Sequence, residues 1–290
     1  MQFAFILAPL LDALLTGACA LLIALGVSLI FSLGGIVSMA HGALYALGAY
    51  LAVVLSYHLG AAPALVVAPA LLGLLGVVIE HVLFARPDRA DAILPLLATF
   101  ALAMVLDQAI RALSGVSWSD SAPSLVQAQM LLPGIGRPQA LLVTLAIAVV
   151  AITLTWLLIH RTPFGRVVRA GMQNAEMVGA LGIALAPYRL AVTALAVALA
   201  GLAGALFASV DTVYPAMGED MLAAAFVVVV IGGLRSFWGL LTAALLVAVA
   251  RGLTAAFEPA ASDAAMVLLL VLAVLLRPRG LFATHQGGRR

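Results

Sequence analysis

The sequence predicts an all-α polytopic membrane protein, and three observations support this fold class. Hydrophobic residues make up 65% of the 290 residues, and only 9% are charged. The mean hydropathy is +1.22, whereas a soluble domain is only about half apolar and about a quarter charged. The apolar residues also form segments near the ~20 residues that a membrane-spanning helix needs. The whole chain, 1–290, is therefore expected to be one transmembrane domain with about eight or nine crossings.

Apolar runs separated by glycine, proline and charged residues predict the individual membrane helices. The expected segments, in chain order, are 13–31, 37–57, 63–84, 93–113, 139–160, 187–209, 221–234, 237–256 and 264–276. The seventh segment is short and ends at Gly232 and Gly233. We expect a broken or re-entrant helix there, and such backbone is tolerated at membrane depth only where protein or a water-filled cavity surrounds it.

Charge placement predicts how the chain is oriented. Arginines gather in alternate connections, and cytoplasmic connections of membrane proteins are rich in basic residues. The arginines assigned to the cytoplasm are Arg86, Arg89, Arg161, Arg166, Arg169, Arg189, Arg235, Arg277, Arg279, Arg289 and Arg290. The opposite connections contain Asp107, Asp120, Asp211, Glu219, Asp220, Glu258 and Asp263. An odd number of crossings then places the N-terminus outside and the C-terminus in the cytoplasm.

Two connections are long enough to have a structure of their own. The outer one, 114–138, is rich in Pro, Ser and Gln and is expected to be an irregular external loop. The inner one, 161–186, is predicted to form a short amphipathic helix or helix pair that ends near Gly182. Its apolar residues recur at helical spacing, namely Val167, Ala170, Met177, Val178 and Leu181. Periodicity alone leaves open whether this segment contacts a partner or lies on the membrane surface.

Several classes of function are excluded by residues that the sequence lacks. All 14 basic residues are arginine, so the chain has neither the lysine of a P-loop nor a lysine for Schiff-base chemistry. Cys19 is the single cysteine, and no metal-ligand spacing occurs, so no metal site is expected. The net charge of +2 gives no basis for nucleic-acid binding. The N-terminal residues carry no basic group, so the first apolar segment is not expected to be a cleaved signal peptide.

The predicted membrane interior contains few polar groups, and most of them are neutral. Glu80, His81, Asp107 and Arg111 fall near segment ends, where charged side chains can reach the interface or pair locally. The deeper polar residues are Ser28, Tyr45, Thr99, Thr144 and Thr193. Ala200, Gly204 and Ala208 form a small-residue face that permits close helix packing. This composition favours a path for a small solute and offers no ion relay, which argues against an ion-coupled secondary carrier.

Two glycine pairs occur at similar places between apolar segments. Gly34-Gly35 is followed by Ser38, and Gly232-Gly233 by Ser236, either as an internal repeat with interrupted helices or by chance. His41 follows the first pair. It is either a hydrogen-bonding residue near the solute path or a satisfied structural histidine at the start of a helix. An intramembrane enzyme would need a catalytic partner for His41, and the sequence has none nearby.

Four motifs in order resemble one family, the LivH-type permease subunits of branched-chain amino acid ABC transporters. The first motif, 34–50, contains Ser38, His41, Gly42 and Tyr45 and is similar to the family's G-x-(N/S)-x-A-H-G signature. The remaining motifs are the cytoplasmic stretch 162–183, the glycine turn 231–239 and the C-terminal 277–282. The resemblance covers nearly the whole chain and implies the permease fold of a type II-like ABC importer.

The resemblance also implies partners and site residues. The partners would be a second permease subunit (LivM-like or a second copy), two ABC ATPase subunits that bind ATP and Mg²⁺, and a soluble solute-binding protein. No cofactor is expected in this chain, which would be a translocation subunit and not an enzyme, in a bacterial inner membrane. The residues that would couple the permease to the ATPase are Gly165, Arg166, Arg169, Ala170, Glu176 and Gly182. Those of the translocation path or gate are Ser38, His41, Gly42, Tyr45, Gly232, Gly233 and Ser236.

Three departures from the family pattern bear on the solute. Ser38 stands where asparagine is frequent, Ala43 stands where a polar residue occurs in several relatives, and Arg235 replaces a small residue in the glycine turn. The expected solutes are branched-chain or related amino acids. Urea, short amides or another small polar solute are the alternative, because specificity resides largely in the binding protein.

Overall fold

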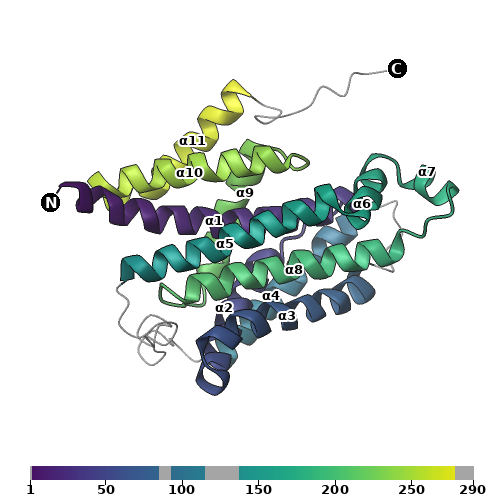
Figure 1. Ribbon diagram of the computed structural model, residues 1–290, viewed down its shortest axis with the longest axis horizontal. Helices are drawn as coiled ribbons and strands as arrows, with labels where there is room; N and C mark the ends of the chain where they lie inside the picture. Colours follow the sequence, from purple (N-terminus) through teal and green to yellow (C-terminus); the bar gives the residue numbers. More distant parts are fainter. Residues whose placement is uncertain (1, 85–92, 115–136, 278–290) are drawn as a thin grey trace.

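The computed structural model describes residues 2–84, 93–114 and 137–277 (Figure 1). The described part of the chain is helical. Its helices are α1 (Gln2–Gly34), α2 (His41–Leu59), α3 (Ala61–Ile79), a π-helical turn (Glu80–Phe84), α4 (Ile93–Ser114), α5 (Arg137–Arg161), α6 (Pro163–Gln173), α7 (Ala175–Ala180), α8 (Ala186–Ala208), α9 (Met217–Gly232), α10 (Phe237–Phe257), a 3₁₀ turn (Pro259–Ala261) and α11 (Ser262–Leu276).

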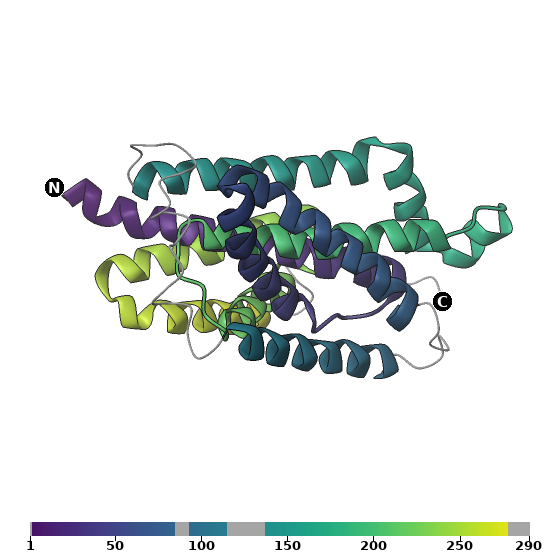
Figure 2. The ribbon, with the colours of Figure 1, turned by 90° about the horizontal axis from the view of Figure 1, so that it is seen from below.

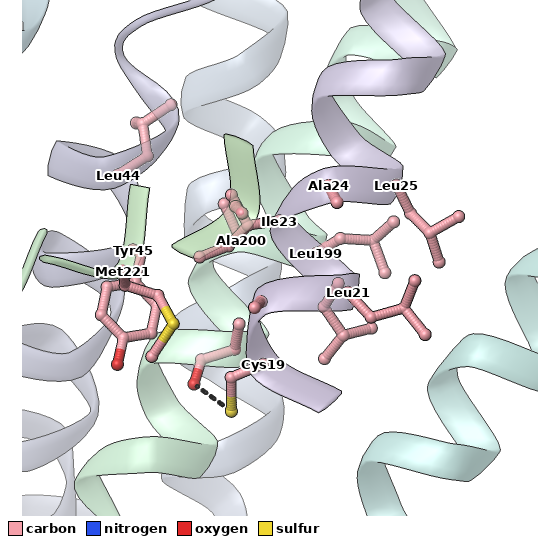
Figure 3. Close-up of a cluster of buried hydrophobic side chains, with 14 of the residues drawn as sticks. Cys19, Leu21, Ile23, Ala24, Leu25, Leu44, Tyr45, Leu199, Ala200 and Met221 are labelled. Atoms are coloured by element: carbon pink, nitrogen blue, oxygen red, sulfur yellow. Dashed lines mark hydrogen bonds between the residues drawn. The ribbon is translucent and has the colours of Figure 1, made fainter. Parts of the chain in front are cut away.

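A bundle of long helices forms the body of the molecule, with α1 near its centre. Helices α1, α5, α8 and α10 run along the long axis, whereas α2 lies steeply across it (Figures 1 and 2). Helix α1 contacts α5, α8 and α10, and α8 also contacts α2 and α3. The core is made of apolar side chains from these helices, and Figure 3 shows part of it around Ile23, Leu25 and Leu199 of α1 and α8.

Small residues let α2, α3 and α8 approach closely. A Cβ added at Gly48 of α2 would lie 2.5 Å from the Gly201 carbonyl oxygen of α8. Gly204 lies against the backbone carbonyl of Tyr45, where no side chain fits. Ala200, Gly204 and Ala208, predicted as a small-residue face, are all buried. Close approach of backbones maximises van der Waals contact, the main source of helix association in a membrane.

Eight of the described helices are long and apolar enough to cross a membrane. These eight helices and the shorter α9 agree with the expectation of about eight or nine crossings. The seventh predicted segment is the one that falls short of a full span, because α9 has only 16 residues. At 1.5 Å per residue it would rise about 24 Å, less than the ~30 Å of the hydrocarbon core. The prediction of a short helix that ends at Gly232 is confirmed.

Several helix boundaries differ from the predicted segments, and those of α1 and α2 are the most informative. Helix α1 begins at Gln2 and not near residue 13, and it continues through Pro9. Helix α2 begins at His41 and not at residue 37. Residues 36, 37 and 39 are apolar, so hydrophobicity alone could not separate this non-helical stretch from the helix that follows.

The bundle has two ends that differ in structure. The α6–α7 end carries α6 and α7, the C-terminus of α1 and the start of α8, as Figure 2 shows. The opposite end, called the distal end, carries the α2–α3 turn at Gly60, the α8–α9 connection 209–216 and the α10–α11 connection 258–261. The external loop predicted at 114–138 lies largely outside the described residues.

Candidate translocation path and coupling site

The first interruption of the helices lies between α1 and α2. Gly35 adopts φ = +68°, a conformation that glycine tolerates and L side chains rarely adopt. The chain then runs back along the bundle before α2 begins at His41 (Figure 2). The Met39 amide donates a hydrogen bond to Thr99 Oγ1 of α4 at 3.2 Å, and Ser38 is buried. A threonine hydroxyl thus satisfies one backbone group that the interruption frees.

His41 lies deep in the bundle and not at its end. Its side chain is fully buried. A Cβ at Gly26 of α1 would lie 3.1 Å from His41 Nε2 and 2.8 Å from the carbonyl oxygen of Ala196, which is halfway along α8. Neither ring nitrogen has a hydrogen-bond partner among the described residues. Hydrogen bonding among the described residues therefore does not support the interpretation of His41 as a structural histidine whose ring nitrogens are both bonded.

Gly42 and Tyr45 follow His41 on α2 and contact different elements. Gly42 lies against the carbonyl of Gly218 at the start of α9, with no room for a side chain. The Tyr45 side chain is fully buried, and its ring centroid is 6.1 Å from that of Phe207. Within the described part of the chain, the Tyr45 hydroxyl has no hydrogen-bond partner. The first motif therefore supplies two buried polar side chains with free hydrogen-bonding capacity.

The second interruption, between α9 and α10, is also stabilised by a hydroxyl group from another helix. Gly233 adopts φ = +86°. Ser28 Oγ of α1 donates a hydrogen bond of 2.5 Å to the Leu234 carbonyl. Ser236 caps α10 by accepting a hydrogen bond from the Gly239 amide at 3.0 Å, and Gly232 lies against Gly239 without room for a side chain. A hydroxyl group from another helix stabilises each interruption. The glycines beside them pack differently, since Gly42 lies against the start of α9 and Gly232 against the start of α10.

The connection 161–186 forms the predicted helix pair. Thr162 caps α6 by accepting from the Gly165 amide, and Asn174 caps α7 by accepting from the Met177 amide. The chain leaves α7 through Gly182, whose φ is +79°. These caps explain why two short helices form here, since each satisfies an amide that the first turn leaves unpaired.

Of the five residues predicted to form the apolar face of this helix pair, only Val178 is buried. The buried residues of α6 are Gly165, Val168 and Gly171, and α7 buries only Val178. Met177 is 59% exposed and Leu181 is 72% exposed. The error arose because two helices with a break at Asn174 do not keep one helical period. Two large apolar side chains therefore project from the bundle on α7 and the turn after it.

The predicted coupling residues fall into two groups. Arg166, Ala170, Glu176 and Gly182 are exposed. Gly165 and Arg169 instead join α6 to α5. Gly165 lies against the Ile159 carbonyl, and Arg169 Nη1 donates a hydrogen bond to the same carbonyl. We call the exposed group, together with Met177 and Leu181, the α6–α7 surface.

One buried carboxylate lies near the α6–α7 end. Glu80 is 5% exposed and begins the π-helical turn. Its Oε2 accepts a hydrogen bond of 2.7 Å from Thr193 Oγ1, and its Oε1 is 3.4 Å from Arg189 Nε. The expectation that Glu80 pairs locally near a segment end is confirmed. Its partners could not be identified from the sequence, because Thr193 is 113 residues away.

A cavity of about 390 Å³ lies at the distal end. Its polar lining comes from α1, α2, α9, α10, α11 and the α8–α9 connection, namely Thr16, Tyr45, Asp211, Tyr214, Asp220, Arg251 and Asp263. Sequence analysis placed the aspartates together on one side of the membrane but did not predict a cavity. The close spacing of Asp211, Tyr214 and Asp220 in the α8–α9 region was the available signal.

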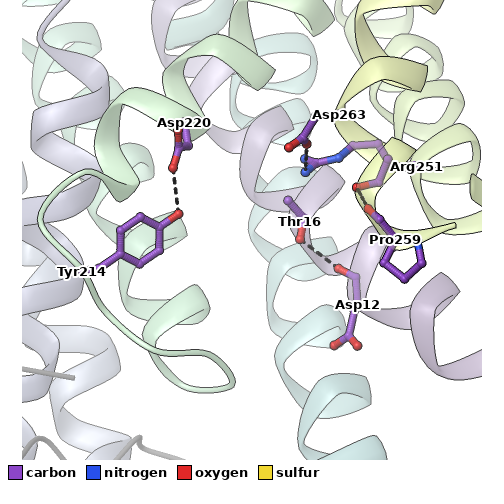
Figure 4. Close-up of polar contacts among 8 residues, drawn as sticks. Asp12, Thr16, Tyr214, Asp220, Arg251, Pro259 and Asp263 are labelled. Carbon is purple, nitrogen blue, oxygen red and sulfur yellow. Dashed lines mark hydrogen bonds and ion pairs between the residues drawn. The ribbon is translucent and has the colours of Figure 1, made fainter. Parts of the chain in front are cut away.

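Two polar contacts order the cavity rim (Figure 4). The Tyr214 hydroxyl donates a hydrogen bond of 2.9 Å to Asp220 Oδ2, and Arg251 Nη2 lies 2.7 Å from Asp263 Oδ1. Partial burial, the Asp220 hydrogen bond and the surrounding carboxylates raise the pKa of Tyr214 to about 12. The phenol therefore stays protonated at physiological pH. Residues 2–84, 93–114 and 137–277 contain no group of three or more His, Cys, Asp or Glu residues arranged to bind a metal.

Comparisons with known proteins agree with the helical architecture and the motifs. The curated relatives include the probable branched-chain amino acid transport permease protein LivH of Methanocaldococcus jannaschii, 26% identical over 90% of this chain and 87% of the relative. BraD of Pseudomonas aeruginosa, a high-affinity branched-chain amino acid transport system permease protein, is 25% identical over 95% of each chain. LivH of Escherichia coli K12 is 24% identical over 97% of this chain and 96% of the relative. No solved structure matches the chain.

A family model also matches most of the chain. It describes the permease component of branched-chain amino acid transport systems and covers residues 10–276, from within α1 to the end of α11. The match therefore includes both interruptions, the α6–α7 surface and the distal cavity. This chain is a multi-pass membrane protein that belongs to the family of permease components of branched-chain amino acid transport systems.

Proposed function

We propose that this chain is the permease subunit of an ABC importer that moves branched-chain amino acids into the cytoplasm. The observation that carries the proposal is the family match over residues 10–276, which includes a helix pair projecting from one end of the bundle. The printed names of the relatives in Methanocaldococcus jannaschii, Pseudomonas aeruginosa and Escherichia coli support the same solute class.

Charge supports an orientation with the α6–α7 end in the cytoplasm. Arg161, Arg166, Arg169, Arg189 and Arg235 lie at this end, and basic residues are enriched on the cytoplasmic side of membrane proteins. Carboxylates dominate the distal end, which would face the outside of a bacterial inner membrane. A solute-binding protein would then deliver the solute there. The N-terminus would be outside and the C-terminus inside.

The α6–α7 surface would be the place where ATPase subunits contact this chain. The chain has no lysine for a P-loop, so ATP and Mg²⁺ would be bound by two partner ATPase subunits, and this chain would be no enzyme. Arg166 is exposed on α6, and the apolar Met177 and Leu181 are exposed on α7 and the turn after it. Interfaces favour such a combination of arginine and large apolar side chains. A second permease subunit, LivM-like or a second copy, would complete the membrane part.

The buried ionisable groups do not favour ion-coupled transport. Among the described residues, the buried ionisable side chains are Cys19, His41, Tyr45, Tyr50 and Glu80. Glu80, the carboxylate among them, is engaged by Thr193 and Arg189 near one end of the bundle. A proton or sodium carrier needs a connected series of such groups through the membrane, and one engaged carboxylate near one end does not provide it.

Reconstitution tests the proposal directly. The chain is assembled in liposomes with its second permease and ATPase subunits, and the solute-binding protein is added on the distal side. We expect concentrative uptake of ³H-leucine that requires ATP on the α6–α7 side. Uptake driven by a proton or sodium gradient without ATP, or ATP-driven uptake of ¹⁴C-urea but not of leucine, would contradict the proposal.

A further inference from the structure

We propose that the distal cavity is a solute subsite that binds the ammonium group of an amino acid bearing an aliphatic side chain. This inference rests on the proposed function, because it names where an imported amino acid first contacts the permease. It also goes beyond it, because family membership assigns no binding residue in this chain. The argument starts from Tyr45 and proceeds to the rim and the floor of the cavity.

Tyr45 provides the first indication of a ligand. Its side chain is fully buried, yet it lines the cavity and its hydroxyl has no hydrogen-bond partner in the part of the chain that the structure describes. Figure 3 shows the Tyr45 ring extending away from Ile23 of the apolar core, with the hydroxyl at its far end. A buried hydroxyl without a hydrogen-bond partner destabilises the protein. A polar solute in the cavity would offset that cost.

The charges at the rim favour a cationic group. Asp211, Asp220 and Asp263 supply three carboxylates to the lining, and Arg251 supplies one guanidinium. Arg251 is already paired with Asp263, and Tyr214 donates to Asp220. Asp211 and Asp220 thus retain acceptor capacity for an ammonium group. A cleft lined by one sign of charge concentrates ligands of the opposite sign, whereas neutral amides and urea gain nothing from it.

The floor of the cavity suits an aliphatic side chain. Met217, Met221 and Met266 line it and are buried. Methionine adapts its shape to different apolar partners, so one floor can accommodate leucine, isoleucine and valine. The volume of about 390 Å³ lies within the range of about 300–1,000 Å³ that small-molecule sites occupy.

Equilibrium binding to the isolated full-length chain tests the subsite without any partner protein. The chain is purified in lipid nanodiscs, and ³H-leucine binding is measured by scintillation proximity. We expect saturable binding that leucinamide, which retains the ammonium group, displaces. 4-Methylpentanoate, which lacks that group, and urea should displace leucine at least about 10-fold less well, because charge-assisted hydrogen bonds are the strong ones.

Two variants with matched controls locate the site. Asp220→Asn should weaken leucine binding about 10-fold or more, whereas Glu219→Gln next to it should not, because Glu219 does not line the cavity. Tyr45→Phe should weaken binding about 3-fold to 10-fold without lowering thermal stability, because its hydroxyl bonds to no described residue. Tyr188→Phe, a ring that stacks on Phe164 at the other end, should bind normally.

The outcomes separate this inference from the proposed function. Absence of saturable leucine binding, or equal binding by wild type, Asp220→Asn and Tyr45→Phe, would overturn the subsite even if the assembled transporter imports leucine. Equal displacement by leucinamide and 4-methylpentanoate would overturn recognition of the ammonium group. Leucine binding that is weakened by Asp220→Asn and Tyr45→Phe but not by the control variants would support the subsite. The ATP-driven uptake assay tests the proposed importer function independently.

Discussion

The two ends of the bundle are built for different contacts. The α6–α7 end projects a helix pair with an exposed arginine and two large exposed apolar side chains, Arg166, Met177 and Leu181. The distal end instead encloses a cavity in which carboxylates line the rim and methionines line the floor. One end presents a surface to a macromolecule, and the other presents a concave site to a small molecule.

This difference shows how a chain with 9% charged residues can serve several partners. Arginines predominate at the α6–α7 end and carboxylates at the distal end, and neutral hydroxyls stabilise the interruptions between the helices. Thr99 binds the Met39 amide, and Ser28 binds the Leu234 carbonyl. The variants below test whether each end has the role assigned to it, from the largest expected effect to the smallest.

The largest effect is expected where α6 meets α5. Gly165→Ala would place a Cβ against the Ile159 carbonyl, which is backbone and cannot move aside. We expect a loss of about 3 kcal/mol or more of stability, at the upper end of overpacking effects. Thermal unfolding can be followed with a thiol-reactive dye, because the single cysteine, Cys19, is buried. The control is Gly179→Ala on α7, where no atom lies within 4 Å, and an equal loss there would refute this packing argument.

Glu80 departs from the separation of charges, because it is a buried carboxylate near the arginine-rich end. Glu80→Ala should cost about 1–3 kcal/mol, since it leaves Arg189 and Thr193 without their partner. Glu80→Gln should cost less, because the amide oxygen still accepts from Thr193. The same thiol-dye assay measures both variants. If both were as stable as wild type, Glu80 would not stabilise this end.

Substitutions of two arginines on α6 distinguish a role in partner contact from a role in folding. Arg166→Ala should reduce ATP-driven leucine uptake by about 5-fold or more and leave thermal stability unchanged, because the side chain is exposed. Arg169→Ala should lower the stability of the chain by about 1–2 kcal/mol, because its guanidinium donates to the Ile159 carbonyl. Uptake and unfolding temperature are measured on the same preparations. Normal uptake by Arg166→Ala would argue against ATPase contact at this residue.

The smallest effect is expected at the distal rim. The Arg251–Asp263 pair spans 2.7 Å, but the Asp263 side chain is 77% exposed. Arg251→Gln should change stability by less than about 1 kcal/mol, as is usual for exposed ion pairs. Thermal unfolding of this variant and of the wild type at low and high salt measures how much the Arg251–Asp263 pair contributes to stability. A loss comparable to that of Glu80→Ala would show that the distal rim is structurally as important as the buried pair.

Much of the architecture could be predicted from the sequence, because apolar runs and glycine pairs mark helices and their ends. The helix pair of 161–186 and the short α9 are examples. The path of residues 35–40 could not be predicted, since Ile36, Val37 and Met39 are as apolar as the helices around them. As a result, the predicted segment begins at residue 37, whereas α2 begins at His41, next to the middle of α8.

The candidate sites were harder to predict than the helices, because they depend on contacts distant in sequence. The coupling residues were identified as a set, but only the structure separates exposed Arg166 from Arg169, which bonds to α5. The distal cavity joins residues from Thr16 to Met266, and no local pattern connects them. Tyr45 was singled out through its motif, and its place in the cavity lining came from tertiary structure.

Site-specific cross-linking tests most directly whether the two ends meet different partners. A Cys19→Ala chain carrying Met177→Cys on α7, or Thr212→Cys in the exposed α8–α9 connection, is assembled with its partner subunits and treated with a short bifunctional thiol reagent. We predict an adduct with the ATPase from Met177→Cys and none from Thr212→Cys. An ATPase adduct from Thr212→Cys, with none from Met177→Cys, would contradict the assignment of the α6–α7 end as the place where energy enters.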